Sequence, residues 1–241
     1  MPIFLRIVPA AILLALPFAA SAQNVSGVPG PVVRDDDRSA EFRIGVDPDS
    51  GEIVQRLHYQ QAVEKDTVAR LQLQYRTDIG EQPKADFVQL QIWHQLTPDS
   101  TPERRQDWQA ALRLDLRLEG DGPPGRVAVN WLNQFHLGEG LNARVFVQGA
   151  LQVGAGADSG LLLQSRTSLR QRSDIGTIGL EQISNYGSTR DFGALADQTH
   201  LVGPFLAVPV ASDWTLNGRA LLGLTRGSDD VNVLLRIQRR F

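Results

Sequence analysis

The residues of this chain that could act on a solute are arginines that recur along short segments of the sequence. Eleven of them fall on the polar faces of these segments, where only four carboxylates, Glu41, Asp115, Glu119 and Glu181, accompany them. In a narrow wet passage, fixed cations that outnumber carboxylates lower the energy of anions and raise that of cations. The predicted pore-lining residues are Arg43, Arg56, Arg70, Arg76, Arg113, Asp115, Arg117, Glu119, Arg144, Arg166, Arg170, Arg219 and Arg236.

A second group could support hydrolysis. Ser184, Asn185, Ser188 and His200 lie on two neighbouring segments that flank the loop from Gly187 to Thr199. A serine within hydrogen-bond reach of a histidine is the arrangement that activates a hydroxyl nucleophile. None of the four histidines stands in a His-x-Ser arrangement on one strand face. We therefore assign no catalytic residue and keep a lipid-modifying hydrolase as the alternative function.

The segments that carry these residues alternate between apolar and polar side chains. From Trp108 to Glu119, six apolar residues occupy every second position, a pattern that a helix would not place on one face. The same period predicts about twelve strands of roughly ten residues, the length that a tilted strand needs to cross an outer membrane. They are Ala40–Val46, Ile53–Gln60, Thr67–Arg76, Phe87–Leu96, Trp108–Glu119, Arg126–Leu137, Leu141–Val153, Leu161–Arg172, Ile175–Tyr186, His200–Val210, Trp214–Thr225 and Val231–Phe241.

Turn-forming residues separate these segments and divide into two sets. Glycine, proline and aspartate are frequent in the longer connections. An even number of strands would place these longer connections outside the cell and the shorter turns in the periplasm. The segment from Thr97 to Gln106 is long for a periplasmic turn, and it contains proline. The strands of one hairpin beside this segment could therefore be counted wrongly, so a barrel of ten strands remains an alternative.

The two ends of the chain predict export and membrane insertion. Residues 1–22 have one early charge, a short apolar run and an Ala-Ser-Ala site, the pattern of a secretory signal peptide. Residues 23–38 contain prolines and a charged run, which predict a flexible periplasmic segment before a barrel over residues 39–241.

The last segment resembles the closing strand of a Gram-negative outer-membrane β-barrel, because it alternates between apolar and polar residues and ends at Phe241. This resemblance implies an all-β fold, a transmembrane up-and-down antiparallel barrel in the cell outer membrane. It also implies that Phe241 belongs to the signal read by the barrel-assembly machinery, although Arg239 departs from the apolar register. A soluble, lipocalin-like barrel shows the same alternation. The membrane version is favoured by aromatic residues gathered at one rim, which are Tyr59, Trp108, Phe135, Trp214 and Phe241.

Composition narrows the partners. The chain has no cysteine, which excludes disulfides and thiolate metal sites, and no cofactor or metal is expected. Its net charge of −3 is too small to suggest nucleic acid. The expected partners are outer-membrane lipids, the assembly machinery and small anionic solutes.

In size, strand number and arginine lining, the chain is similar to small porins that pass acidic oligosaccharides, a resemblance of architecture without a family motif. It implies a small passive channel that prefers anions. Two alternatives use the same barrel: arginines and carboxylates that pair into a plug, and a closed structural or adhesin barrel that acts through its loops.

Overall fold

The computed structural model describes residues 27–34, 36–46, 48, 51–78, 80–98 and 107–241. The predicted signal peptide, residues 1–22, lies outside them. The strands are β1 (Arg38–Val46), β2 (Ile53–Glu64), β3 (Thr67–Thr77), β4 (Lys84–Gln95), β5 (Trp108–Glu119), β6 (Gly125–His136), β7 (Leu141–Val153), β8 (Leu162–Ser173), β9 (Gly176–Ser188), β10 (Thr199–Pro209), β11 (Trp214–Gly223) and β12 (Val231–Arg240). A short 3-10 helix, η1 (Leu195–Asp197), lies between β9 and β10.

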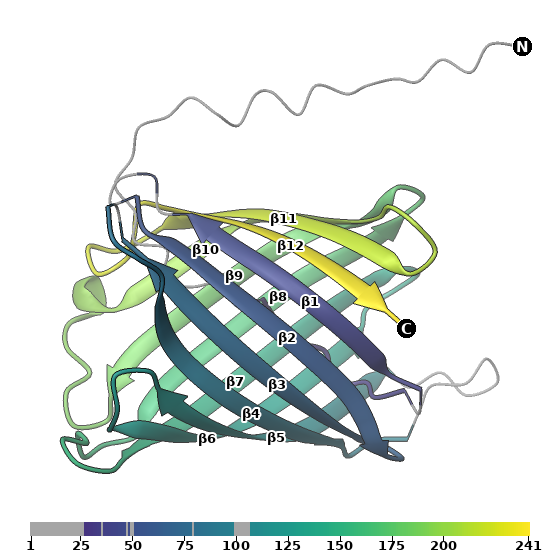
Figure 1. The fold of residues 1–241 in the computed structure, drawn as a ribbon. Coiled ribbons are helices and arrows are strands. Elements are labelled where there is room, and N and C mark those ends of the chain that lie inside the picture. Colours follow the sequence, from purple (N-terminus) through teal and green to yellow (C-terminus); the bar gives the residue numbers. More distant parts are fainter. Residues whose placement is uncertain (1–26, 35, 47, 49–50, 79, 99–106) are drawn as a thin grey trace, which may run out of the picture.

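The twelve strands form one closed antiparallel barrel in which each strand pairs with its neighbours in sequence and β1 pairs with β12 (Figure 1). This confirms the predicted fold class and strand count. β4 pairs directly with β5, so the alternative with ten strands is wrong.

The outer surface of the barrel is apolar, as the alternation predicts. On β5, Leu112, Leu114 and Leu116 are each 43% to 48% exposed, while Arg113 and Asp115 between them point inward and are buried. An apolar outside around a polar inside is the pattern of a barrel that spans a membrane. No helix among the described residues is long and apolar enough to cross a bilayer.

The two ends of the barrel differ in the length of their connections. One end carries short turns, at residues 65–66, 137–140, 174–175 and 210–213, together with the longer connection from 96 to 107. The start of β1 and the end of β12 meet at this short-turn end, where the Phe241 amide donates a hydrogen bond of 2.9 Å to the Arg38 carbonyl. The opposite, long-loop end carries the connection of residues 189–198.

The predicted aromatic rim lies at the short-turn end. The Phe241 ring is 60% exposed, and Tyr59 and Trp108 are also exposed. Arg239, which departs from the apolar register, donates a hydrogen bond of 2.9 Å to Asp213. This hydrogen bond lowers the pKa of Asp213.

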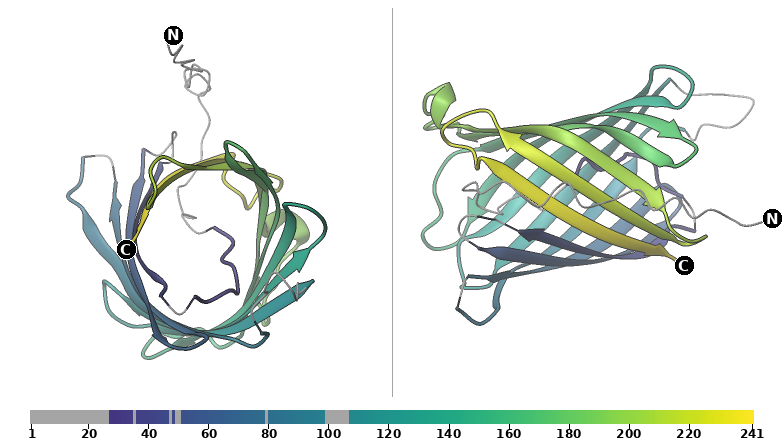
Figure 2. Two further views of the ribbon diagram at one scale, coloured as in Figure 1. Left: turned by 90° about the vertical axis from the view of Figure 1, so that its right-hand side faces the viewer. Right: turned by 90° about the horizontal axis from the view of Figure 1, so that it is seen from above.

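The segment before β1 does not follow the expectation of a flexible periplasmic segment. Its described residues lie inside the barrel (Figure 2). Val28 and Val33 are 5% and 2% exposed, and they pack against inward-facing residues of the barrel wall. The strands therefore enclose a part of their own chain.

Candidate functional site: an arginine-lined cavity inside the barrel

Side chains that point inward from the strands line a cavity of about 700 Å³. Its lining reaches from Gly227 and Asp229 at the long-loop end to Arg240 at the short-turn end. Thirteen arginines but only six carboxylates take part in this lining among the described residues. The cavity therefore extends along the barrel axis, and cationic side chains outnumber anionic ones in its lining.

The structure brings twelve of the thirteen predicted pore-lining residues to this cavity. They are Arg43, Arg56, Arg70, Arg76, Arg113, Asp115, Arg117, Arg144, Arg166, Arg170, Arg219 and Arg236. Glu119 lies at the end of β5 beside the lining and accepts a hydrogen bond of 2.7 Å from Arg117. The two-residue period located these side chains because an inward position on a strand stays inward at every second residue.

Sequence reasoning missed several lining residues. Arg126 and Arg240 add positive charge, and Asp37, Asp86 and Asp229 add negative charge. Arg126 could have been predicted as a lining residue, since it stands on the polar side of a predicted strand. Asp229 lies in a loop and Asp37 in the segment before β1, where no strand period applies.

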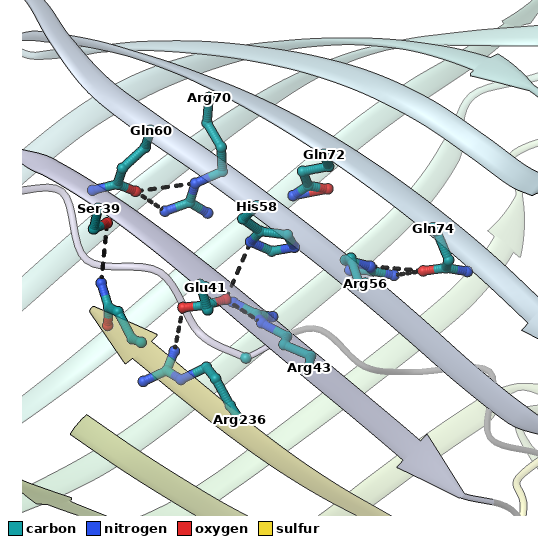
Figure 3. A network of polar contacts seen from close by, with 12 residues as sticks. Ser39, Glu41, Arg43, Arg56, His58, Gln60, Arg70, Gln72, Gln74 and Arg236 are labelled. Atoms are coloured by element: carbon teal, nitrogen blue, oxygen red, sulfur yellow. Dashed lines mark hydrogen bonds and ion pairs between the residues drawn. The ribbon is translucent and has the colours of Figure 1, made fainter. Parts of the chain in front are cut away.

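A network of polar contacts joins β1, β2 and β12 across the closing seam of the barrel (Figure 3). Arg43 and Arg236 stand directly opposite each other in the pairing of β1 with β12. Glu41 lies between them: it pairs with Arg43, with Arg236 at 3.4 Å and with His58 at 3.1 Å. One carboxylate thus offsets the repulsion of two like charges at the seam.

Other arginines on the wall are also paired with carboxylates. Arg113 contacts Asp115 at 2.7 Å, and Arg219 contacts Glu181 at 3.1 Å. Each of these pairs joins positions that both face the cavity. This part of the wall matches the plug alternative, in which charges satisfy one another.

A further set of arginines contacts neutral groups instead. Arg70 donates to the side-chain oxygen of Gln60, and Arg144 donates to that of Gln134 at 2.7 Å. Among the described residues, neither guanidinium has a carboxylate within 4.0 Å. No carboxylate of the described wall therefore neutralises the charge of these two arginines by direct contact.

The segment before β1 occupies part of this space. Val28 and Val33 join an apolar cluster with five inward-facing side chains, Val68, Trp93, Ala111, Leu132 and Phe146. The Val33 amide donates a hydrogen bond of 2.7 Å to Oε1 of Gln95. The Gly27 carbonyl accepts one of 3.3 Å from Arg166. The passage is therefore narrower than the strands alone would leave it.

The alternative hydrolytic group is brought together only in part. Ser184 and His200 both point to the outer surface, and their Oγ and Nδ1 atoms are 2.7 Å apart. His200 also contacts Gln198 through Nε2 at 3.3 Å. These roles are the reverse of the serine triad, in which Nε2 faces the serine and Nδ1 the third member. However, Ser184 is only 1% exposed, and Asn185 points to the cavity. An ester therefore has no direct approach to the Ser184 hydroxyl in this structure.

No group of three histidine, aspartate or glutamate side chains that could hold a metal ion occurs within the described part of the chain.

No protein-family model and no curated protein sequence matches the chain. Solved structures with a similar fold are known, however. An outer-membrane channel from Pseudomonas putida F1 is similar with a TM-score of 0.64 at 11% identity, over 90% of this chain and 100% of that one. The KdgM porin in complex with disordered oligogalacturonate gives 0.63 at 8% identity, over 84% and 99%. The NanC porin gives 0.63 at 12% identity, over 84% and 98%. The chain thus shares the fold of small outer-membrane channel proteins.

Proposed function

We propose that this chain is an outer-membrane channel through which small anionic solutes diffuse passively. The observation that carries the proposal is the charge of the cavity, where thirteen arginines face six carboxylates in the part of the chain that the structure describes. The low-dielectric wall of a barrel focuses this field on the passage, so that anions are stabilised within it and cations are repelled. The apolar outer surface supports placement in the outer membrane, with the short-turn end toward the periplasm.

The same observations favour a channel over the two alternatives. A complete plug would pair its charges, yet Arg70, Arg144 and Arg166 contact amide and carbonyl oxygens. A hydrolase would present its nucleophile to the lipid, yet Ser184 is buried. The chain itself supplies the remaining obstruction, through the segment before β1.

The experiment that tests this function is a reversal-potential measurement on protein reconstituted in planar bilayers under a KCl gradient. We expect a small conductance and a reversal potential whose sign shows that chloride permeates more readily than potassium. Replacing Arg70 and Arg126 together by glutamine should move the reversal potential toward zero, because two cations leave the lining. The matched control is Arg226→Gln, at an exposed loop position, which should leave selectivity unchanged.

The contrary outcomes are distinct. If the protein inserts but carries no current, even after the segment before β1 is removed, the plug alternative is correct. If cations are preferred, the assignment of the inward face to the solute is wrong.

A further inference from the structure

The inner wall formed by β7 and β8 carries three arginines around one serine. Arg144 on β7 stands opposite Ser168 on β8 in the strand pairing. Arg166 and Arg170 lie two residues before and after Ser168, so all three arginines share its inward face. All three line the cavity. This arrangement gathers three positive charges on two adjacent strands.

None of these three guanidiniums has a carboxylate oxygen within 4.0 Å among the described residues. Glu181 faces Ser168 from β9 but contacts Arg219 at 3.1 Å. Arg170 stacks over the Phe205 ring, 5.1 Å from its centre. The cluster therefore has positive charge that the wall does not neutralise by direct contact.

The serine within this cluster points to an oxygen-rich ligand. Ser168 is 4% exposed, and its hydroxyl has no hydrogen-bond partner in the described part of the chain. A buried hydroxyl without a partner is unfavourable, so such groups are normally satisfied by protein, water or ligand. An anionic oxygen held by the neighbouring guanidiniums would accept a hydrogen bond from it.

Backbone of the segment before β1 covers this cluster. The Gly27 carbonyl accepts a hydrogen bond of 3.3 Å from Nη1 of Arg166. Gly30 lies against Arg144 so closely that a β-carbon on residue 30 would be 2.8 Å from the Arg144 Cζ. Neutral backbone therefore stands where an anion would meet these arginines. A charged ligand forms stronger hydrogen bonds with guanidinium than a peptide carbonyl does.

The spacing of the arginines defines the ligand. Positions 166 and 170 are four residues apart on one strand, about 13 Å between their α-carbons at about 3.3 Å per residue. The two guanidiniums also point apart, since that of Arg166 lies over the Phe146 ring on β7 and that of Arg170 lies over the Phe205 ring on β10. A solute with two or more anionic groups can contact both of them at once.

We propose that Arg144, Arg166, Arg170 and the hydroxyl of Ser168 form a binding subsite for solutes with two or more carboxylate or phosphate groups. Gly27–Gly30 occupies this subsite until such a solute displaces it. The subsite deepens the proposed function and rests on it, because the solute reaches the cluster through the passage.

Citrate, a tricarboxylate, is the probe for the first test. Its binding is read as transient block of the KCl current and, independently of conduction, by calorimetry in detergent. Ser168→Ala and Arg170→Gln should each weaken citrate binding about tenfold, the effect of losing one hydrogen bond to a charged group. The matched control is Arg172→Gln, two residues beyond Arg170 at an exposed position of the same strand and outside the cavity lining, which should bind citrate as the unaltered protein does.

A cysteine reports displacement of the segment, since the chain has none of its own. Val28→Cys places a thiol at a buried position of the segment, and a neutral maleimide avoids any effect of citrate charge on reagent concentration. We expect citrate to accelerate labelling of Val28→Cys severalfold, and not of Ser159→Cys on a loop. Adding Arg144→Gln and Arg166→Gln should abolish the acceleration. If Val28→Cys does not assemble, Pro29→Cys replaces it.

The outcomes separate this inference from the proposed function. A channel that prefers chloride, but binds citrate equally in Ser168→Ala, Arg170→Gln and the Arg172→Gln control and shows no change in labelling, overturns the subsite alone. Citrate binding with unchanged labelling overturns the displacement. Loss of anion preference in KCl overturns the proposed function itself.

Discussion

The backbone amide of Val33 donates a hydrogen bond of 2.7 Å to the side chain of Gln95, 62 positions away in the sequence. This contact fastens the segment before β1 to the inner wall of β4. Farther along, Gln60 donates a hydrogen bond of 2.8 Å to Asp37, and the Ala62 amide donates one of 2.7 Å to the Asp37 carbonyl. These contacts hold the segment close to where β1 begins, and the hydrogen bond from Arg166 to the Gly27 carbonyl holds it farther from β1.

Replacing Gln95 by alanine should therefore loosen the segment and widen the passage. Loss of one hydrogen bond of about 1 kcal/mol shifts the ratio of docked to undocked segment about fivefold. We expect more frequent transitions to a larger conductance level in single-channel records. Val33→Asp should have a stronger effect, because it places a carboxylate in an apolar cluster. Gln148→Ala is the control, since it loses one inward hydrogen bond to Asn130. Equal gating in both glutamine variants would contradict the prediction.

The carboxylate at the closing seam should contribute to the stability of the barrel. Glu41→Gln leaves Arg43 and Arg236 opposed without a charge between them. Breaking a buried pair of this kind costs about 3–5 kcal/mol, and the water in the passage will reduce that value. We expect the folded band on a gel to be lost at a lower temperature than for the unaltered protein. Glu64→Gln, at an exposed strand end, is the comparison; a shift of equal size there would argue against a special role for the seam.

Removing Phe241 should reduce assembly into the membrane. The deletion removes an outward aromatic ring and the hydrogen bond from its amide to the Arg38 carbonyl. We expect the chain to lose most of its heat-modifiable species in outer-membrane fractions, with Phe241→Trp close to normal. Unchanged amounts after the deletion would show that assembly does not read this residue.

Ser184 and His200 should contribute to packing and not to hydrolysis. Ser184 is buried, although its hydroxyl is 2.7 Å from the histidine. We expect the purified protein to release fatty acid from phospholipid vesicles no faster than a detergent blank, with His200→Ala identical. Hydrolysis that His200→Ala abolishes would establish the enzyme instead.

The strands and their faces were predictable from the sequence because alternation is a local property. In β5, Leu112, Leu114, Leu116 and Leu118 are exposed on the outer surface, and Arg113, Asp115 and Arg117 line the cavity. The arginine lining followed from the same period. The pairing of β1 with β12 was predicted through the resemblance to a closed barrel, since it joins residues as distant as 42 and 237.

The position of the segment before β1 was not predicted, because prolines and a charged run have no strand period. A signal was nevertheless present on the opposite wall. Trp93, Leu132 and Phe146 are large apolar residues on faces that are mostly polar. In a wet passage such residues need an apolar partner, which Val28 and Val33 provide. The position of the segment was therefore indicated by these apolar residues on the opposite wall, and not by the sequence of the segment itself.

Enclosure of this segment bears on the order in which the barrel assembles. A closed cylinder admits a chain only through its ends, whereas an unfinished sheet is open along one side. The β1–β12 seam joins the most distant parts of the chain, so its loop-closure entropy is the largest of any strand pair. If the other strands pair first, the segment is laid on the concave face of a curved sheet and trapped when the seam closes. The chain would then leave assembly with its passage already narrowed by the segment. A newly inserted barrel would therefore not form a wide, unobstructed pore in the membrane.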